Sequence, residues 1–253
     1  MKQTNNAIKF LMAQYRAIFK NANIAMVAAM AAAALAAGQA QAAAIESFNN
    51  TELGKLAAAT EIKVTGDGAK DGESKKIELT GGATDNGLAH TITISAGAAA
   101  NTIKGTAGSA DVNLSASSLK IAGATKDAAK LTIGDGTQTT KVNLKKLDVS
   151  KSGTLALTAK ADAQSGEGTF VNAETIVLGG GEKPASGDIA VTLDKNTSLS
   201  GTESLTIKTG AAVTVSGGAT LGGGAITVED GSIALGTASD ADNLGVLSTT
   251  GKL

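Results

Sequence analysis

One short phrase, apolar–any–apolar, recurs from Ile62 almost to the C-terminus, and it constrains the fold more than any other feature. Residues two apart on a strand face the same side, so each phrase predicts a short strand that points two side chains inward. The middle residue is usually Thr, Lys, Asn, Asp, Glu or Ala, which suits an outward position. The predicted inward positions are Ile62/Val64, Ile77/Leu79, Ile92/Ile94, Val112/Leu114, Leu119/Ile121, Leu131/Ile133, Val142/Leu144, Leu147/Val149, Leu155/Leu157, Ile176/Leu178, Ile189/Val191/Leu193, Leu205/Ile207, Val213/Val215, Ile226/Val228 and Ile233/Leu235.

Glycine-rich turns separate the phrases, and Asp-Gly dipeptides begin at Asp67, Asp71, Asp135 and Asp230. This spacing fits a parallel β-solenoid or an antiparallel β-sandwich. The short strands, the 2% content of aromatic residues and the similar sizes of the inward residues favour the solenoid. We predict an all-β, right-handed parallel β-solenoid (β-helix) over residues 61–253, with the β-sandwich as the alternative. Three strands per coil of roughly 20 residues would give on the order of ten coils.

The first 42 residues have the composition of a secretory signal peptide. They contain four basic residues and no acid, and an uninterrupted apolar run from Ile24 to Gly38 follows the basic part. The run is shorter than the roughly 20 residues of a membrane span. We predict cleavage after Ala42, with Ala44 as a second possibility and an uncleaved amphipathic anchor helix as the alternative. Residues 43–60 show helix-like spacing and are predicted to be an N-terminal cap or a disordered leader.

The charge balance argues against nucleic acid as a partner, and the cysteine content excludes disulfides. The chain has 22 basic and 23 acidic residues, and removal of the four basic residues before position 42 would leave 18 basic residues against 23 acidic ones. The only arginine, Arg16, lies in the predicted signal peptide. An acidic chain without arginine is not expected to bind nucleic acid. With no cysteine, the protein has no disulfides and must be stabilised by packing alone.

From Ile62 to Leu244 the sequence resembles the passenger domains of Gram-negative autotransporter adhesins, most closely in TGAAVTVSGGATLGGGAITVEDGSIAL (Thr209 to Leu235). The resemblance implies a β-helix at the cell surface or outside the cell, associated with the outer membrane and often adhesive or biofilm-forming. Its implied partners are other copies of itself or molecules on host or bacterial surfaces. It implies no catalytic residues. The ten-residue alternating strands of an outer-membrane barrel are missing from the sequence, so contact with the membrane is expected only through a separate or missing barrel.

Few residues are candidates for chemistry. His90 is the only histidine, cannot form a zinc site by itself and is predicted to be a surface residue. Asp67, Asp71 and Glu73 are close in sequence but match no calcium-binding loop, so a solvated turn is predicted. Asp135 and Asp230 are predicted turn residues.

These observations predict no catalytic, cofactor-binding or metal-binding residue, and no enzyme. The predicted function is adhesion, self-association or biofilm formation. A structural role in an extracellular matrix or surface layer is the alternative, and a polysaccharide-acting enzyme is a disfavoured third.

Overall fold

The computed structural model describes residues 44–97, 101–108, 111–160, 162–164, 166–180, 188–236 and 245–251. They belong to one compact unit, which covers residues 44–253. The predicted signal peptide and its cleavage site at Ala42 lie outside the described residues.

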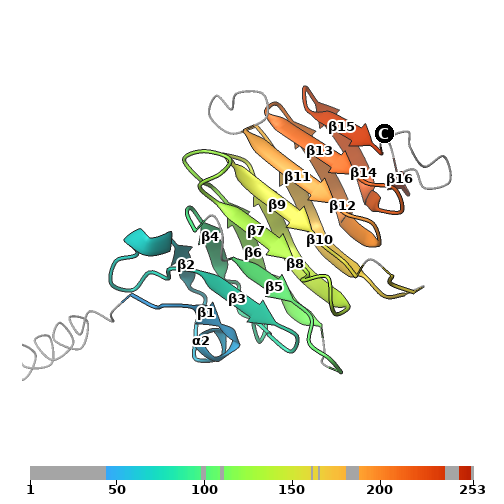
Figure 1. Ribbon diagram of the computed structural model, residues 1–253. Coiled ribbons are helices and arrows are strands. Elements are labelled where there is room, and N and C mark those ends of the chain that lie inside the picture. Colours follow the sequence, from blue (N-terminus) through green and yellow to red (C-terminus); the bar gives the residue numbers. More distant parts are fainter. Residues whose placement is uncertain are drawn as a thin grey trace, which may run out of the picture. The chain divides into compact units, whose positions relative to one another are not determined.

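Successive strands alternate between two parallel sheets of eight strands each (Figure 1). Each strand pairs with the strand two further along the chain, so the chain completes a coil before it returns to the same sheet. All ladders between these strands are parallel, which confirms a parallel solenoid and excludes the antiparallel sandwich.

The odd-numbered strands form one sheet, called here the odd sheet, and the even-numbered strands form the even sheet. The odd sheet contains β1 (Phe48–Asn49), β3 (Ile77–Thr80), β5 (Thr102–Lys104), β7 (Lys130–Ile133), β9 (Gly153–Leu157), β11 (Ile189–Leu193), β13 (Ala211–Val215) and β15 (Ser232–Leu235). The even sheet contains β2 (Glu61–Val64), β4 (Thr91–Ile94), β6 (Val112–Ile121), β8 (Thr140–Val149), β10 (Thr169–Leu178), β12 (Thr197–Lys208), β14 (Thr220–Glu229) and β16 (Val246–Thr249).

The coils are longer and fewer than the sequence predicts. Leu147, Ile176 and Leu205 occupy one register position in successive coils, so each of these coils takes 29 residues. The next coil, from Leu205 to Ile226, takes 21. Eight strands per sheet replace the predicted ten coils. The prediction was wrong because the phrases mark strands and carry no information about the length of the turns between them.

In the long even strands, the alternation of buried and outward residues shifts by one position midway. In β8 the alternation of burial runs to Leu144, then Lys145 and Lys146 both point outward, and burial resumes at Leu147. The same break follows Ala173 in β10, where the register to β12 also shifts. Two outward residues in a row turn the strand, in the manner of a bulge. Three strands per coil were predicted, but each coil has two. The long even strand supplies two buried segments and the odd strand supplies the third.

The core is a column of stacked aliphatic side chains between the two sheets. Each predicted inward residue from Ile62 to Ile226 is buried, which confirms the predicted facing over that range. The last coil differs: Val228 is 47% exposed, Leu235 is 42% exposed and Ile233 is only partly buried. These three residues belong to β14 and β15, and no described strand covers the second half of β14 or the outer edge of β15.

Residues 44–60 lie against the first coils. β1 pairs with β3, and the helix α2 (Asn50–Gly54) follows directly, with the Asn49 side chain accepting hydrogen bonds from the amides of Thr51 and Glu52. Phe48 and Leu53 are both buried in the common core. A cap would make such contacts with the first coils. That residues 43–60 act as a cap remains a prediction.

Candidate functional surfaces

The prediction that His90 is a surface residue is wrong. The side chain is 2% exposed, and its Nδ1 accepts a hydrogen bond from the amide of Thr60 at 3.2 Å. His90 directly precedes β4, at a corner where the next coil stacks on it, and its own amide donates to Oγ of Ser117 at 3.2 Å. A polar residue at a stacked corner is covered by its neighbours, which the sequence pattern alone does not reveal.

Asp85 is the centre of a buried polar network at the same corner. Its carboxylate is 3% exposed and accepts hydrogen bonds from the amide of Gly87 at 3.0 Å, the amide of Ala116 at 2.9 Å and Oγ of Ser117 at 3.0 Å. Thr84 pairs with Asn113, so Asp85 takes the inward position that Leu114 takes one coil later. The network therefore replaces apolar packing with a satisfied carboxylate that holds the turn in place.

Asp85, His90 and Ser117 are the residue types of a hydrolase triad, but their hydrogen bonds are different. In a triad the serine hydroxyl bonds to the imidazole, and the imidazole bonds to the carboxylate. Here Oγ of Ser117 bonds directly to the carboxylate, and the imidazole of His90 bonds to a backbone amide. None of the three lines a described hollow. We interpret the cluster as structural. The cluster is not evident from the sequence, because Asp85 stands in GGATDNG, which has the composition of a turn.

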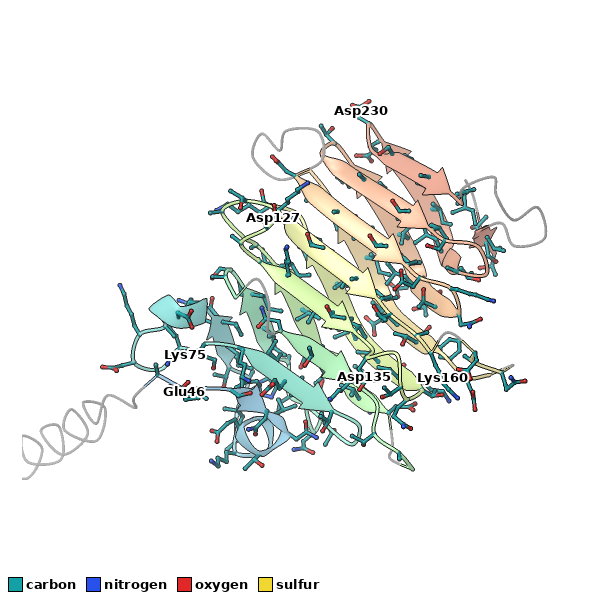
Figure 2. The ribbon with its side chains drawn as sticks, in the orientation of Figure 1. Glu46, Lys75, Asp127, Asp135, Lys160 and Asp230 are labelled. Carbon is teal, nitrogen blue, oxygen red and sulfur yellow. The ribbon has the colours of Figure 1, made fainter. Side chains whose placement is uncertain are left out.

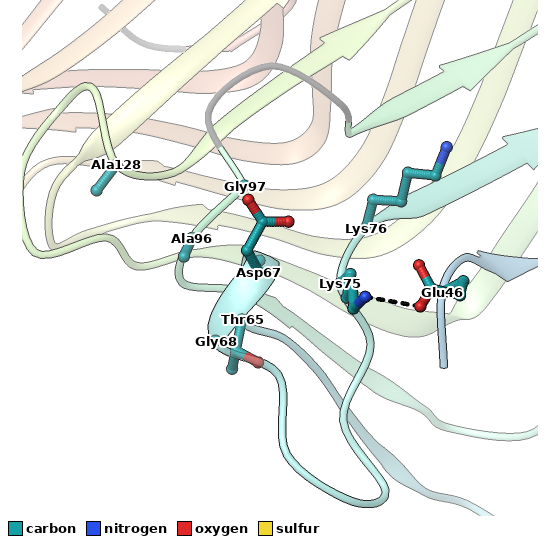
Figure 3. Close-up of a pocket in the computed structure, with 10 residues that line it drawn as sticks. Glu46, Thr65, Asp67, Gly68, Lys75, Lys76, Ala96, Gly97 and Ala128 are labelled. Carbon is teal, nitrogen blue, oxygen red and sulfur yellow. Dashed lines mark hydrogen bonds and ion pairs between the residues drawn. The ribbon is translucent and has the colours of Figure 1, made fainter. Parts of the chain in front are cut away.

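A hollow with a volume of about 680 Å³ lies beside the first coils (Figure 3). Its walls come from the short 3-10 helix η1 (Gly66–Gly68) and from Lys75, Lys76 and Gly97, among others. The Nζ of Lys75 lies 2.6 Å from Oε1 of Glu46, and this hydrogen bond raises the pKa of Lys75. Lys76 is paired with Glu78 outside the hollow, so three of its four charged side chains already have ionic partners. Among the described residues, the hollow contains no group of side chains that could hold a metal ion.

The acidic residues of the turns are held by local hydrogen bonds. Glu73 accepts from the amide of Lys70 and the hydroxyl of Thr65, which together lower its pKa. Partial burial acts to raise the pKa of Asp135, but hydrogen bonds from Thr137 and Gln138, together with the nearby charge of Lys104, outweigh this effect and lower it. Figure 2 shows Asp127, Asp135, Lys160 and Asp230 in the turns, away from the strands of the odd sheet. Among the described residues, no group of three or more acidic, His or Cys side chains could hold a metal ion.

The outward faces carry rows of stacked small or uncharged polar residues. On the even sheet Asn113, Asn143 and Asn172 occupy one register position in three successive coils, and Ser200 continues the row. On the odd sheet the outward positions from β9 to β15 are all small and uncharged. They are Thr154, Ala190, Ala212 and Ser232 in one row and Ala156, Thr192, Thr214 and Ala234 in the other.

These rows are the most regular feature that the outer surface presents. Adjacent members are separated by the strand spacing of about 4.8 Å. The sequence predicts the outward residue types, but only the register shows which of them share a row, as the three asparagines do.

The fold places the chain in the class of parallel β-solenoids. Comparison with family models, with curated proteins and with solved structures gives no match to this chain. In the part of the chain that the structure describes, no helix is long and apolar enough to span a membrane.

Proposed function

We propose that this chain is an exported β-solenoid that acts outside a Gram-negative cell, at the surface or released, in adhesion or self-association. We further propose that its coils are right-handed, the hand preferred by crossovers between parallel strands. The parallel solenoid is the architecture that the resemblance to autotransporter passengers implies, and the amino-terminal sequence has the basic start and apolar run expected of a signal peptide. The proposed partners are other copies of the protein or surface molecules of host or bacterial cells.

The stacked outward rows are the observation that carries this proposal. Asn113, Asn143 and Asn172 present the same amide group at each step, so a partner with a matching repeat could form the same contact many times. Residues 43–253 contain no Trp, Tyr or Arg, the residue types enriched at interface hot spots. A single contact should therefore be weak, and useful binding would come from many contacts or many copies, where linkage raises avidity.

Dense and sparse display on a cell surface would test the proposal. We expect cells that carry many copies to aggregate and cells that carry few to remain dispersed. Asn143→Lys places a charge in the middle of the asparagine row and should reduce aggregation. Gln138→Lys, in an exposed turn, adds the same charge away from the row and should not. Equal aggregation by both variants would show that the row is not the adhesive feature.

Export needs a separate experiment. The proposed cleavage after Ala42 predicts that the exported protein begins at Ala43, or at Ile45 if Ala44 is the site. N-terminal sequencing of exported protein measures this directly, and a sequence beginning at Met1 would rule out cleavage.

The absence of catalysis is also a proposal. Incubation of the purified protein with polysaccharides should release no new reducing ends, and turnover would favour the enzyme alternative.

A further inference from the structure

The turn between β3 and β4 contains a chemically labile pair of residues. Asn86 is followed by Gly87, and no other asparagine in the chain precedes a glycine. Glycine has no side chain to shield its backbone nitrogen, so this nitrogen can approach the side-chain amide of a preceding asparagine. Both residues are exposed, and the side chain of Asn86 has no hydrogen bond within the described part of the chain. No partner of its own therefore holds this amide group away from the backbone.

The reaction open to this pair is deamidation. The backbone nitrogen of Gly87 loses its proton and attacks Cγ of Asn86, and the side-chain nitrogen of Asn86 takes up a proton and leaves as ammonia. Water then opens the cyclic imide at either of its carbonyl groups, which leaves aspartate or isoaspartate at this position. Water is the only co-reactant, and no group is oxidised or reduced. The first requirement is that the Gly87 amide gives up its proton.

The folded turn holds this proton in place. Asp85 to Leu88 form a β-turn, in which the Leu88 amide donates to the carbonyl oxygen of Asp85 at 2.9 Å. The φ angles of 52° at Asn86 and 76° at Gly87 are those of a type I′ turn, for which Asn-Gly is a preferred sequence. The Gly87 amide donates to Oδ1 of Asp85 at 3.0 Å. This carboxylate binds the proton that the reaction must remove, and its negative charge opposes a second negative charge on the nearby nitrogen.

The carboxylate of Asp85 is positioned by the next coil. Its Oδ2 accepts hydrogen bonds from the amide of Ala116 at 2.9 Å and from Oγ of Ser117 at 3.0 Å, and both residues belong to β6. From this arrangement we infer that Asn86 is a deamidation site that the stacked coils keep inactive. The site becomes reactive when β6 separates from the turn, because Gly87 then loses its charged acceptor and the chain can leave the type I′ conformation.

Deamidation would make such an opening permanent. Isoaspartate continues the chain through its side-chain carbonyl and lengthens the backbone by one methylene group. The Leu88 amide would then no longer meet the carbonyl oxygen of Asp85 in the same turn. Copies that have opened would be marked and unable to restore the hydrogen bonds of Asp85. This inference concerns the lifetime of the protein and does not depend on its proposed adhesive role.

Deamidation rates of the folded and unfolded protein test the inference. The full chain is incubated at mildly alkaline pH in buffer and in urea, and peptide mass spectrometry measures the fraction of Asn86 that is converted. We expect the folded protein to react at least about a hundredfold more slowly, because the reaction requires an opening that is rarely populated. Hydrogen exchange of the Gly87 amide is a second readout, since exchange in alkaline buffer also begins with loss of that proton. This amide should be protected although the residue is exposed.

Two variants separate the carboxylate of Asp85 from acidic charge in general. Asp85→Ala removes the acceptor of the Gly87 amide and should raise the rate in buffer by about tenfold or more. Asp111→Ala removes an exposed carboxylate and should change the rate less than about twofold. Circular dichroism establishes that both variants are folded, and the two wild-type measurements decide if Asp85→Ala is not. Equal rates in buffer and in urea, an unprotected Gly87 amide, or an Asp85→Ala variant that reacts no faster than Asp111→Ala would each overturn the inference.

Discussion

The side chain of Asn50 bonds to the backbone of Thr80 as a strand residue would. Its amide nitrogen donates to the Thr80 carbonyl oxygen at 3.2 Å, and its amide oxygen accepts from the Thr80 amide at 2.9 Å. Asn50 is also the first residue of α2, directly after the two residues of β1. One side chain thus extends the ladder of the odd sheet beyond the point where the backbone leaves it.

Substitution of Asn50 by Ala should destabilise the first coils. The amide and carbonyl of Thr80 would lose their partners, which we expect to lower the free energy of unfolding by about 1–2 kcal/mol. Chemical denaturation of wild type and variant measures the difference. Thr51→Ala is the control, because Thr51 is exposed and its side chain has no hydrogen bond among those described. If both variants unfolded at the same denaturant concentration, the edge role of Asn50 would be wrong.

Substitution of Asp85 by Ala should cost more than a typical turn mutation. The hydroxyl of Ser117 would lose its buried acceptor and keep only the carbonyl of Leu88, and the partly exposed amides of Gly87 and Ala116 would lose theirs, which together should lower stability by about 1–3 kcal/mol. Asp111→Ala removes an exposed aspartate and should change stability by less than about 0.5 kcal/mol. Thermal and urea unfolding measure both effects, and comparable losses would contradict the structural role of the network.

The facing of β12 can be tested with two adjacent residues. Ile207 is fully buried, whereas Thr206 lies on the outer face of the same strand. Ile207→Asp should unfold the surrounding coils, because an unpaired charge cannot be solvated there. Thr206→Asp should cost about 0.5 kcal/mol or less. Limited proteolysis and circular dichroism would detect the difference, and similar behaviour of the two variants would refute the assigned register.

Glu78 should make part of the stability depend on acid pH. Oγ of Ser47 donates to its carboxylate at 2.7 Å, and Lys76 lies close on the other oxygen, so the pKa of Glu78 is below its ordinary value of 4.5. A carboxyl group with a lowered folded-state pKa stabilises the fold above about pH 4.5. This contribution is lost as the pH falls through the folded-state pKa.

The Ser47→Ala variant should raise the pKa of Glu78 towards 4.5 and reduce the loss of stability between neutral and acid pH. NMR titration of the Glu78 carboxyl carbon measures the pKa, and denaturation at the two pH values measures the stability. Ser47→Thr keeps the hydroxyl and serves as the control. A pKa that is the same in Ser47→Ala and in wild type would show that this hydrogen bond is not its main cause.

Sequence patterns were sufficient to predict most strands and their buried faces, but not β1, β5, β16 or the first halves of β10, β12 and β14. Pairs such as Leu147 and Val149 are buried wherever a neighbouring coil covers them, because alternation follows from strand geometry alone. Turn lengths follow no such rule, so the 29-residue coil was not predictable from the phrases. The double outward step at Lys145 and Lys146 was also missed, since two adjacent lysines are equally compatible with a turn.

The buried cluster of Asp85, His90 and Ser117 could not be predicted from the sequence for a different reason. Whether Asp85 and His90 face water depends on which residues stack on them from the next coil, and this depends on register. The exposed last coil shows the same dependence. Ile233 has the same sequence pattern as Val213, and only the presence of a covering strand distinguishes their burial.

The equal 29-residue spacing of Leu147, Ile176 and Leu205 makes the coil a unit that can be removed whole. Deletion of residues 148–176 would join Leu147 to Val177, so that β8 continues into the end of β10 with each side chain on its original face. β11 could then stack on β7, and β12 on the fused strand. Such a chain should fold with a cooperative transition and a circular dichroism spectrum of the same form, whereas deletion of 28 residues would turn an inward face outward. Gene rearrangement could therefore change the reach of this protein in whole coils without altering the chemistry of any remaining contact.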